Sequence, residues 1–247
     1  MGRSWRVAWT VISIFIVESL VFGLAVLPAF LFWRLIQWWP LPRPRESVIE
    51  PMVIAMTLLP AYLVFAVALV VLSAVSVRLC GWRTPADSAW RIADLEWPLL
   101  NWVRYMISTH VVRILVGTLF RSSPLWTFYL RLNGARIGRG VFVNSMSISD
   151  HSLLEFGDDV VIGESVHLSG HTVEGGVVKT GRVRLGRGVT VGLGSIVGIG
   201  VVAGDRCQIG ALSVVPKHTV LDAGAVYVGV PVRRLDVASP TDGGVEV

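Results

Sequence analysis

Lysine and cysteine are almost absent from this sequence of 247 residues, which has two of each. Two cysteines, Cys80 and Cys207, are too few for a disulfide framework. With only Lys179 and Lys217, the net charge of +5 comes mainly from arginine, and most arginines lie in the first half of the chain. That distribution fits the anionic headgroups of a lipid bilayer better than nucleic acid. We therefore expect a membrane partner and no nucleic-acid partner.

Two long runs contain almost no charge. Ala8–Trp33 and Met52–Leu79 each exceed the ~20 apolar residues that cross a bilayer. The mean hydropathy of +0.64 is too high for a wholly soluble domain. Tryptophans that could anchor the first run at the interfaces are Trp5, Trp9, Trp33, Trp38 and Trp39. The segment Arg34–Glu50 is rich in proline and should turn, so residues 1–83 are predicted to form a two-helix transmembrane hairpin.

The arginines also suggest an orientation. Five lie on the side of the two termini, against three in the linker: Arg3, Arg6, Arg78, Arg83 and Arg91, against Arg34, Arg43 and Arg45. Positive charge favours the cytoplasmic side. We therefore predict a multi-pass protein of the cell membrane whose C-terminal domain is cytoplasmic.

One acidic residue, Glu18, interrupts the first apolar run. A charge in the middle of a bilayer costs about 2.5–3.5 kcal/mol on insertion scales, so Glu18 should be protonated or face protein. It could bind an acceptor or handle protons as an accessory group, or it could pair with another helix. The sequence leaves both open.

The stretch Pro85–Arg131 mixes aromatic, aliphatic and arginine residues. This composition suits interfacial amphipathic helices with a basic face, and it equally suits a helical neck packed on the next domain. We assign residues 84–131 to this element.

From Leu185 onward the chain follows a strict six-residue period. Bulky apolar residues recur at Leu185, Val191, Val197, Ala203, Ile209, Val215, Leu221 and Tyr227. Small or β-branched residues follow four positions later, at Val189, Ser195, Val201, Cys207, Ser213, Thr219 and Ala225. Glycine stands directly after the first five bulky residues, as tight corners require. The pattern predicts a left-handed parallel β-helix of hexapeptide repeats over residues 132–235, followed by a disordered tail over 236–247.

The period also occurs upstream of Leu185, with two interruptions, Ile148–Glu155 and Val173–Arg182. Insertions in a solenoid leave as loops on one face, which is often the working face. The functional residues are therefore expected at these two interruptions.

His171 directly precedes the second interruption and should point outward. A neutral imidazole can take a proton from an amine or hydroxyl that attacks an activated acyl carbon. Glu174 could orient the imidazole, and the backbone at Gly175 and Gly176 could approach a ligand. Backbone N–H groups near Gly170 or at Gly175 and Gly176 could stabilise an oxyanion. The alternative is a surface His–Glu pair that merely pins the loop.

Asp150 and His151 lie in the first interruption. One coil takes roughly eighteen residues, so both could sit near His171 as accessory groups. A metal site from His151, His167 and His171 is conceivable. No cysteine or carboxylate cluster supports it, and we predict no metal.

The C-terminal repeats carry a further signature. The run Ala211-Leu-Ser-Val-Val-Pro-Lys217 and the later run Tyr227-Val-Gly-Val-Pro-Val-Arg-Arg234 resemble the closing segments of hexapeptide-repeat acyltransferases. In that family these segments line the coenzyme A channel, a histidine is the general base, and the assembly is a homotrimer. The resemblance implies that Lys179, Lys217, Arg233 and Arg234 bind the donor together with Gly175 and Gly176; a solvated basic edge is the alternative.

A second resemblance covers roughly residues 1–235. The runs Ser123–Gly138, His171–Glu174 with Lys179, and Thr180–Gly186 are similar to the C-terminal membrane region of poly-lysine-type nonribosomal peptide synthetases. That region joins aminoacyl thioesters on a carrier protein to a free amine. It has paired transmembrane helices and tandem β-helix-like modules, which a homotrimer of this chain would rebuild.

The sequence thus favours a membrane-anchored acyltransferase. It would move an acyl or aminoacyl group from a thioester donor to an amine or hydroxyl, with His171 as general base. The donor would be coenzyme A or the phosphopantetheine arm of an acyl or peptidyl carrier protein. Carrier-dependent amide synthesis and a non-catalytic trimeric membrane scaffold are the alternatives.

Overall fold

The chain folds into two compact units. The computed structural model describes residues 2–38 and 48–235. The first unit is helical and takes in the residues up to 84 together with 90–120; the second takes in 85–89 and the residues from 121 onward. The predicted turn within Arg34–Glu50 falls mostly on residues 39–47, and the predicted disordered tail is 236–247, so both lie outside the described residues.

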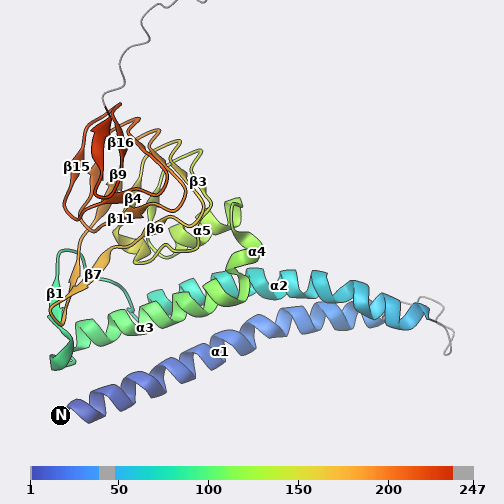
Figure 1. Cartoon of the computed structure of the whole chain (residues 1–247). Helices are drawn as coiled ribbons and strands as arrows, with labels where there is room; N and C mark the ends of the chain where they lie inside the picture. The colour runs from blue at the N-terminus through green and yellow to red at the C-terminus, as the bar shows by residue number, and fades with distance from the viewer. Residues whose placement is uncertain (1, 39–47, 236–247) are drawn as a thin grey trace, which may run out of the picture. The chain divides into compact units, whose positions relative to one another are not determined.

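The predicted hairpin corresponds to two long helices, α1 (Arg3–Trp38) and α2 (Ile49–Leu79). They lie side by side (Figure 1). The rings of Phe22 on α1 and Phe65 on α2 meet edge to face, with centroids 5.4 Å apart. Ala25 of α1 and Ala66 of α2 are fully buried, which fits the small residues that let transmembrane helices pack closely.

A third long helical stretch packs against this pair. The strand β1 (Ala89–Arg91) and the 3-10 turn η1 (Ile92–Asp94) lead into it. It comprises α3 (Trp97–Val112), the π-helical turn η2 (Arg113–Gly117) and α4 (Thr118–Phe120). One apolar cluster contains Ile14 of α1, Val77 of α2 and Tyr105 of α3, so the three helices share a core.

Three described helices are long and apolar enough to cross a membrane: Arg3–Trp38, Pro51–Leu79 and Trp97–Phe120. Their outward surface is also apolar, with Phe15 75% exposed and Leu79 82% exposed. The third helix lies in the segment for which the sequence predicts an interfacial element or a neck. Length and composition allow it to span a bilayer as well, and its placement stays a prediction.

The second unit is a parallel β-helix preceded by the helix α5 (Pro124–Leu132). The strands of its coils are β2 (Arg136–Ile137), β3 (Phe142–Val143), β4 (Leu154–Phe156), β5 (Val161–Ile162), β6 (His167–Leu168), β9 (Val183–Leu185), β10 (Thr190–Val191), β11 (Ile196–Val197), β12 (Val202–Ala203), β13 (Gln208–Ile209), β14 (Val214–Val215), β15 (Val220–Leu221) and β16 (Val226–Val228). β17 (Arg233–Leu235) returns antiparallel to β16.

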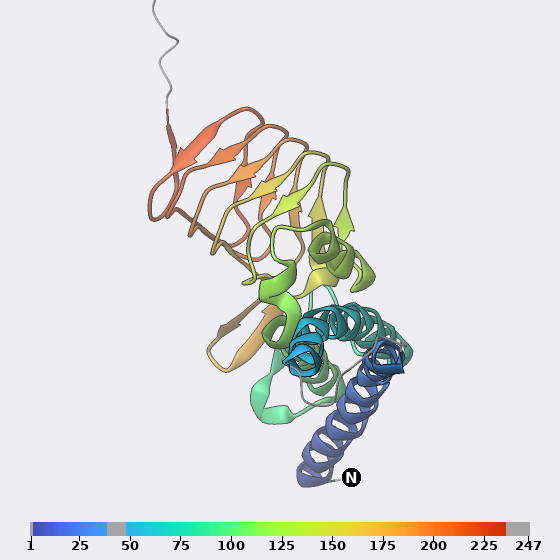
Figure 2. The same cartoon turned by 90° about the vertical axis from the view of Figure 1, so that its right-hand side faces the viewer.

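The strands form three sheets, ordered β17-β16-β13-β10-β5-β3, β14-β11-β6 and β15-β12-β9-β4-β2. The hexapeptide rhythm sets their register: Thr190 pairs with Gln208, eighteen residues on, and Val202 pairs with Val220 in the same way. Three short strands therefore make one coil, and the coils stack as a ladder (Figure 2). The predicted fold class, a helical hairpin followed by a hexapeptide β-helix of the left-handed class, is confirmed.

The inward positions are those that the period predicts. The bulky residue Val191 and the small residues Ser195 and Cys207 are buried to within 1% of complete burial. A Cβ at Gly192 would stand 2.4 Å from the backbone nitrogen of Ala211 on the next coil. Glycine is required there because the coils approach too closely for a side chain.

Both predicted interruptions leave the regular coil. The first contains the 3-10 turn η3 (His151–Leu153). The second overlaps a β-hairpin of β7 (His171–Glu174) and β8 (Val177–Thr180), which begins two residues before the predicted interruption. Ser88 forms two hydrogen bonds with Thr180 at the base of the hairpin: its carbonyl accepts from the Thr180 N–H, and its own N–H donates to the Thr180 side-chain hydroxyl. The interruptions thus add ordered structure to one region of the solenoid.

Candidate active site

The two interruptions bring a histidine and an aspartate together. Asp150 directly precedes η3, and His171 is the first residue of β7. The coils that carry them are paired, since the Ser149 N–H donates to the Leu168 carbonyl at 3.1 Å. Residues 21 positions apart in the sequence are therefore neighbours in space.

His171 and Asp150 form a close pair. The distance from His171 Nδ1 to Asp150 Oδ2 is 2.5 Å. The Asp150 side chain is completely buried, whereas the His171 side chain keeps 22% of its surface exposed. A buried carboxylate thus holds one edge of an imidazole that reaches solvent.

Two serines complete the carboxylate's surroundings. The hydroxyls of Ser149 and Ser169 lie 3.2 Å and 3.3 Å from Asp150 Oδ2. Ser169 Oγ also lies 2.9 Å from His171 Nδ1 and accepts the His171 backbone N–H at 3.2 Å. A buried charge needs such partners, and these fix both members of the pair.

Backbone geometry makes the pair possible. Asp150 has a left-handed φ of 52°, a conformation that aspartate tolerates better than most residues. A Cβ at Gly170 would lie 2.8 Å from the Cβ of Asp150 and 2.8 Å from a methyl group of Leu153. Glycine at position 170 therefore allows the His171 strand to approach Asp150.

This arrangement suits general base chemistry. A histidine that donates its Nδ1–H to a carboxylate carries its basic lone pair on Nε2. The carboxylate keeps the ring in one orientation and stabilises the imidazolium that forms when Nε2 takes a proton. The pair can therefore accept a proton from an amine or hydroxyl and return it to a leaving group.

The carboxylate observed in contact with His171 is Asp150, whereas the sequence predicts Glu174 as the orienting group. Glu174 binds Lys179 at 3.2 Å and also makes a short contact with Lys217. Hydrogen bonds from Lys217 and Lys179 hold the pKa of the Glu174 carboxyl below its usual value. Asp150 takes the place beside His171 that we predicted for Glu174, and Glu174 instead connects the hairpin to the following coils.

Gly175 and Gly176 form the tip of the hairpin between β7 and β8. Their φ values are 56° and 74°. Two consecutive positive φ values are what a tight two-residue hairpin turn requires. No atom lies within 4 Å of a Cβ built on either glycine, so conformation explains these residues, and their predicted contact with a donor stays a prediction.

The predicted donor-binding cations are all at the surface. Lys179 and Lys217 are about half exposed and hold Glu174. Arg234 lies on β17 and binds Asp222 at 3.1 Å, while Arg233 is exposed beside it. The structure connects the two lysines through one carboxylate; their contact with phosphate stays a prediction.

His151 has a structural environment. Its side chain is only 2% exposed, and its ring meets that of Tyr129 on α5 edge to face at 5.8 Å. Its Nε2 lies 3.3 Å from the Ile148 carbonyl. His151 therefore packs between α5 and the coil, while its neighbour Asp150 faces the site.

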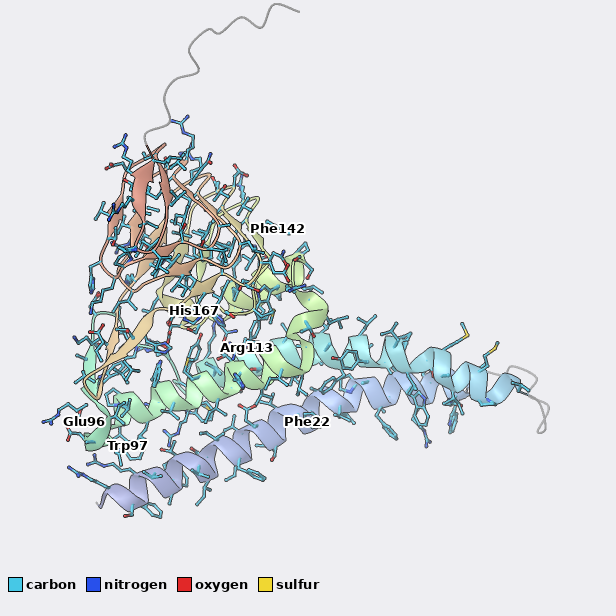
Figure 3. The ribbon with its side chains drawn as sticks, viewed as in Figure 1. Phe22, Glu96, Trp97, Arg113, Phe142 and His167 are labelled. Atoms are coloured by element: carbon cyan, nitrogen blue, oxygen red, sulfur yellow. The ribbon has the colours of Figure 1, made fainter. Side chains whose placement is uncertain are left out.

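The remaining predicted groups have no contact with this pair among the interactions described above. Within residues 2–38 and 48–235, no three His, Cys, Asp or Glu side chains are placed to hold a metal ion. His167 is exposed on β6 (Figure 3). Burial raises the pKa of the Cys207 thiol to about 11, with Asp222 adding to the shift, so Cys207 is an inert core residue as predicted. Glu18 lies on α1 and lines a cavity in the helical unit.

The sequence singles out Gly170 only as a possible oxyanion contact, and it does not predict Ser169 or the role of Gly170 in letting the His171 strand approach Asp150. Both residues follow the inward Leu168 directly, in the run Leu168-Ser-Gly-His171. A glycine and a hydroxyl immediately before the candidate base are the only local signal that the chain turns closely against a neighbouring coil there.

Among curated proteins, one similarity supports the predicted resemblance. No protein-family model matches the chain. The chain is 29% identical over 136 residues to the delta-poly-L-ornithine synthetase of Acinetobacter baumannii (strain AB307-0294), which is 55% of this chain. The matched part is 10% of that protein, so the chain spans about a tenth of its relative's length. The resemblance to a poly-amino-acid synthetase is confirmed as a similarity of sequence.

Solved structures similar to the chain include three acetyltransferases. The serine acetyltransferase of Neisseria gonorrhoeae is 20% identical, with 76% of this chain and 78% of that chain covered and a TM-score of 0.38. The maltose O-acetyltransferase of Clostridium difficile 630 is 20% identical, with 53% of this chain and 86% of that chain covered and a TM-score of 0.37. A galactoside acetyltransferase in complex with coenzyme A is 21% identical, with 53% of this chain and 80% of that chain covered and a TM-score of 0.38. Scores this low carry no argument about activity.

Proposed function

We propose that the protein is a membrane-anchored acyltransferase in which His171 and Asp150 act as a base and its orienting carboxylate. The single observation that supports this most is the 2.5 Å contact between a completely buried Asp150 and a partly exposed His171. A pair that only pinned a surface loop would not need a fully desolvated carboxylate. The position of the pair at both interruptions of the solenoid supports the same reading.

The reaction uses only these two side chains. The nitrogen or oxygen of the acceptor attacks the carbonyl carbon of a thioester while His171 Nε2 takes the acceptor's proton. The tetrahedral intermediate collapses, the carbon–sulfur bond breaks, and the imidazolium returns the proton to the departing thiolate. The products are an amide or ester and a free thiol. Asp150 stays ionised throughout and stabilises the imidazolium.

The donor is a thioester of phosphopantetheine, on coenzyme A or on a carrier protein. The donor's phosphate groups would bind positively charged side chains of the C-terminal coils, namely Lys217, Arg233 and Arg234. Lys217 would then exchange Glu174 for a phosphate oxygen, which an exposed pair allows at little cost.

The similarity to a poly-ornithine synthetase supports a second candidate, amide synthesis from a carrier-bound amino acid. Both candidates use the same base and differ in the donor. The apolar helices support anchoring in the cell membrane. The proposal that the β-helix is cytoplasmic rests on the excess of arginines beside the two ends of the hairpin. We further propose a homotrimer, which light scattering of the detergent-solubilised protein would measure as three chains.

Donor binding tests the proposal. The purified protein is titrated first with coenzyme A and then with a phosphopantetheinylated carrier, and its thermal unfolding is followed. A stabilisation by coenzyme A supports a coenzyme A-dependent transferase; a stabilisation by the carrier alone supports the peptide-synthetase reading. No stabilisation by either contradicts the proposal and favours a trimeric membrane scaffold.

A further inference from the structure

The helical unit contains a cavity of about 380 Å³, in the size range of small-molecule sites. Its walls come from all three long helices: Ile14, Phe15, Glu18, Ser19 and Phe22 on α1, Leu69 on α2, and Ile107 and Val111 on α3. Phe15 and Phe22 are 75% and 46% exposed, and Phe22 is labelled on α1 in Figure 3. The cavity therefore opens at the apolar outer surface of the helices.

Glu18 is the one ionisable group in the lining. Its carboxyl has a hydrogen bond with the Ser108 hydroxyl. Its Oε1 atom is buried and has no hydrogen-bond partner. No basic side chain in the described part of the chain forms an ion pair with it. An acidic group in such surroundings needs a partner.

The cation on the adjacent turn of α3 has other partners. Arg104 Nε donates to Ser13 Oγ at 3.0 Å, and Nη1 donates to Asn101 Oδ1 at 2.7 Å. Its guanidinium also lies over the rings of Trp82 and Trp97, at 5.9 Å and 5.5 Å from their centroids. The third nitrogen, Nη2, is buried without a hydrogen-bond partner. Among the described residues no ion pair joins Arg104 to Glu18, so the contact that Glu18 makes is with a hydroxyl and not with a cation.

We propose that this cavity binds a long-chain primary amine, whose ammonium group pairs with Glu18 and whose hydrocarbon chain lies against the apolar walls. An ammonium group supplies both the charge and the hydrogen-bond donor that Oε1 lacks. An uncharged head on the same chain would leave the carboxylate without a counter-charge. The site does not depend on acyl transfer at His171.

Thermal unfolding in a neutral detergent tests the site without any thioester, so its failure is distinct from failure of the acyltransferase proposal. Dodecylamine should raise the unfolding temperature of the wild type saturably, and dodecanol should not. Glu18→Gln keeps the size of the side chain and removes its charge, so the apparent affinity for the amine should fall by roughly tenfold or more. Equal shifts with amine and alcohol, or an unchanged affinity in Glu18→Gln, would overturn the proposal.

Two further variants separate the cavity from general effects of a cationic amphiphile. Glu96→Gln makes the same change at an exposed glutamate just before α3, and should respond to dodecylamine as the wild type does. Val111→Phe leaves Glu18 in place and fills the cavity, and should abolish the shift. A full shift in Val111→Phe, or a loss in Glu96→Gln equal to that in Glu18→Gln, would place the amine elsewhere.

Discussion

Asp150 is a charged residue that the fold buries completely in a left-handed backbone conformation. Each feature is unfavourable alone, since an unpaired buried charge costs several kcal/mol. The hydroxyls of Ser149 and Ser169 and the imidazole of His171 compensate for the burial. The pair is therefore built into the solenoid, unlike the surface pair that was the alternative reading of His171.

Asp150→Asn tests the role of the carboxylate. Asparagine has nearly the same shape and tolerates a positive φ, so the fold should persist. It lacks the charge that stabilises the imidazolium, so kcat should fall by about 10²-fold or more, with a smaller change in KM. Initial rates at saturating donor measure the effect. Circular dichroism and the unfolding temperature control for folding. A variant with wild-type kcat would remove Asp150 from the mechanism.

At the scale of elements, the hairpin of β7 and β8 is connected to later coils by Glu174, which contacts Lys217. This carboxylate is exposed, and exposed ion pairs contribute little. The hairpin is thus held mainly by its backbone pairing and by Thr180, whose hydroxyl donates to the Pro85 carbonyl at 2.8 Å.

Glu174→Gln distinguishes the two carboxylates near the candidate base. Because Glu174 binds lysines and not His171, the variant should change kcat by less than about fivefold. The measurement is the same rate assay as for Asp150→Asn. If Glu174→Gln instead lost as much activity as Asp150→Asn, the original prediction that Glu174 orients His171 would be correct for the working enzyme.

A second ionic feature crosses three neighbouring strands. Glu155 on β4 stands in register between Arg136 of β2 and Arg184 of β9, and Arg182 donates to it at 2.8 Å. Partial burial raises the pKa of Glu155, but the hydrogen bonds from Arg182 and Arg184 and the positive charges of Arg184 and Arg136 together outweigh burial and hold the pKa below its usual value of 4.5.

This shift predicts a pH dependence of stability. A lowered pKa contributes stability above the unfolded value of 4.5, and the contribution disappears as the pH falls through the lower folded value. Near pH 6, Glu155→Gln should therefore have a lower free energy of unfolding than the wild type, by up to about 1 kcal/mol, and a correspondingly lower unfolding temperature. The difference should shrink toward pH 3. A difference that is constant with pH would contradict this account.

For the whole molecule, periodicity predicted the parts that repeat. Spacing alone places Val191, Ile209 and Tyr227 on one inward row, because each of these regular coils takes eighteen residues. Long apolar runs likewise predicted α1 and α2. The need for glycine at position 192 was also predictable, because neighbouring coils approach closely wherever the repeat is regular.

The site could be predicted only in part, because it lies where the period fails. Arg136 pairs with Glu155, nineteen residues on, and Thr190 pairs back to Val161, twenty-nine residues away. Where a coil contains more than eighteen residues, the side chains that follow are shifted relative to the neighbouring coil, and the local sequence does not reveal by how much. The left-handed turn at Asp150 also has no glycine to signal it. His171 was therefore found, and its carboxylate partner was assigned to the nearer Glu174.

The most direct test of the central claim is release of free thiol from a thioester donor by three proteins: wild type, His171→Ala and His167→Ala. The donors are acetyl-coenzyme A and an aminoacylated carrier, with lysine or ornithine as acceptor. His167 is a matched control because it is an exposed histidine on the preceding strand, β6. Wild type and His167→Ala should show acceptor-dependent turnover, and His171→Ala should lose at least about 10²-fold in rate, because it lacks the general base. Undiminished turnover by His171→Ala would contradict this role of His171.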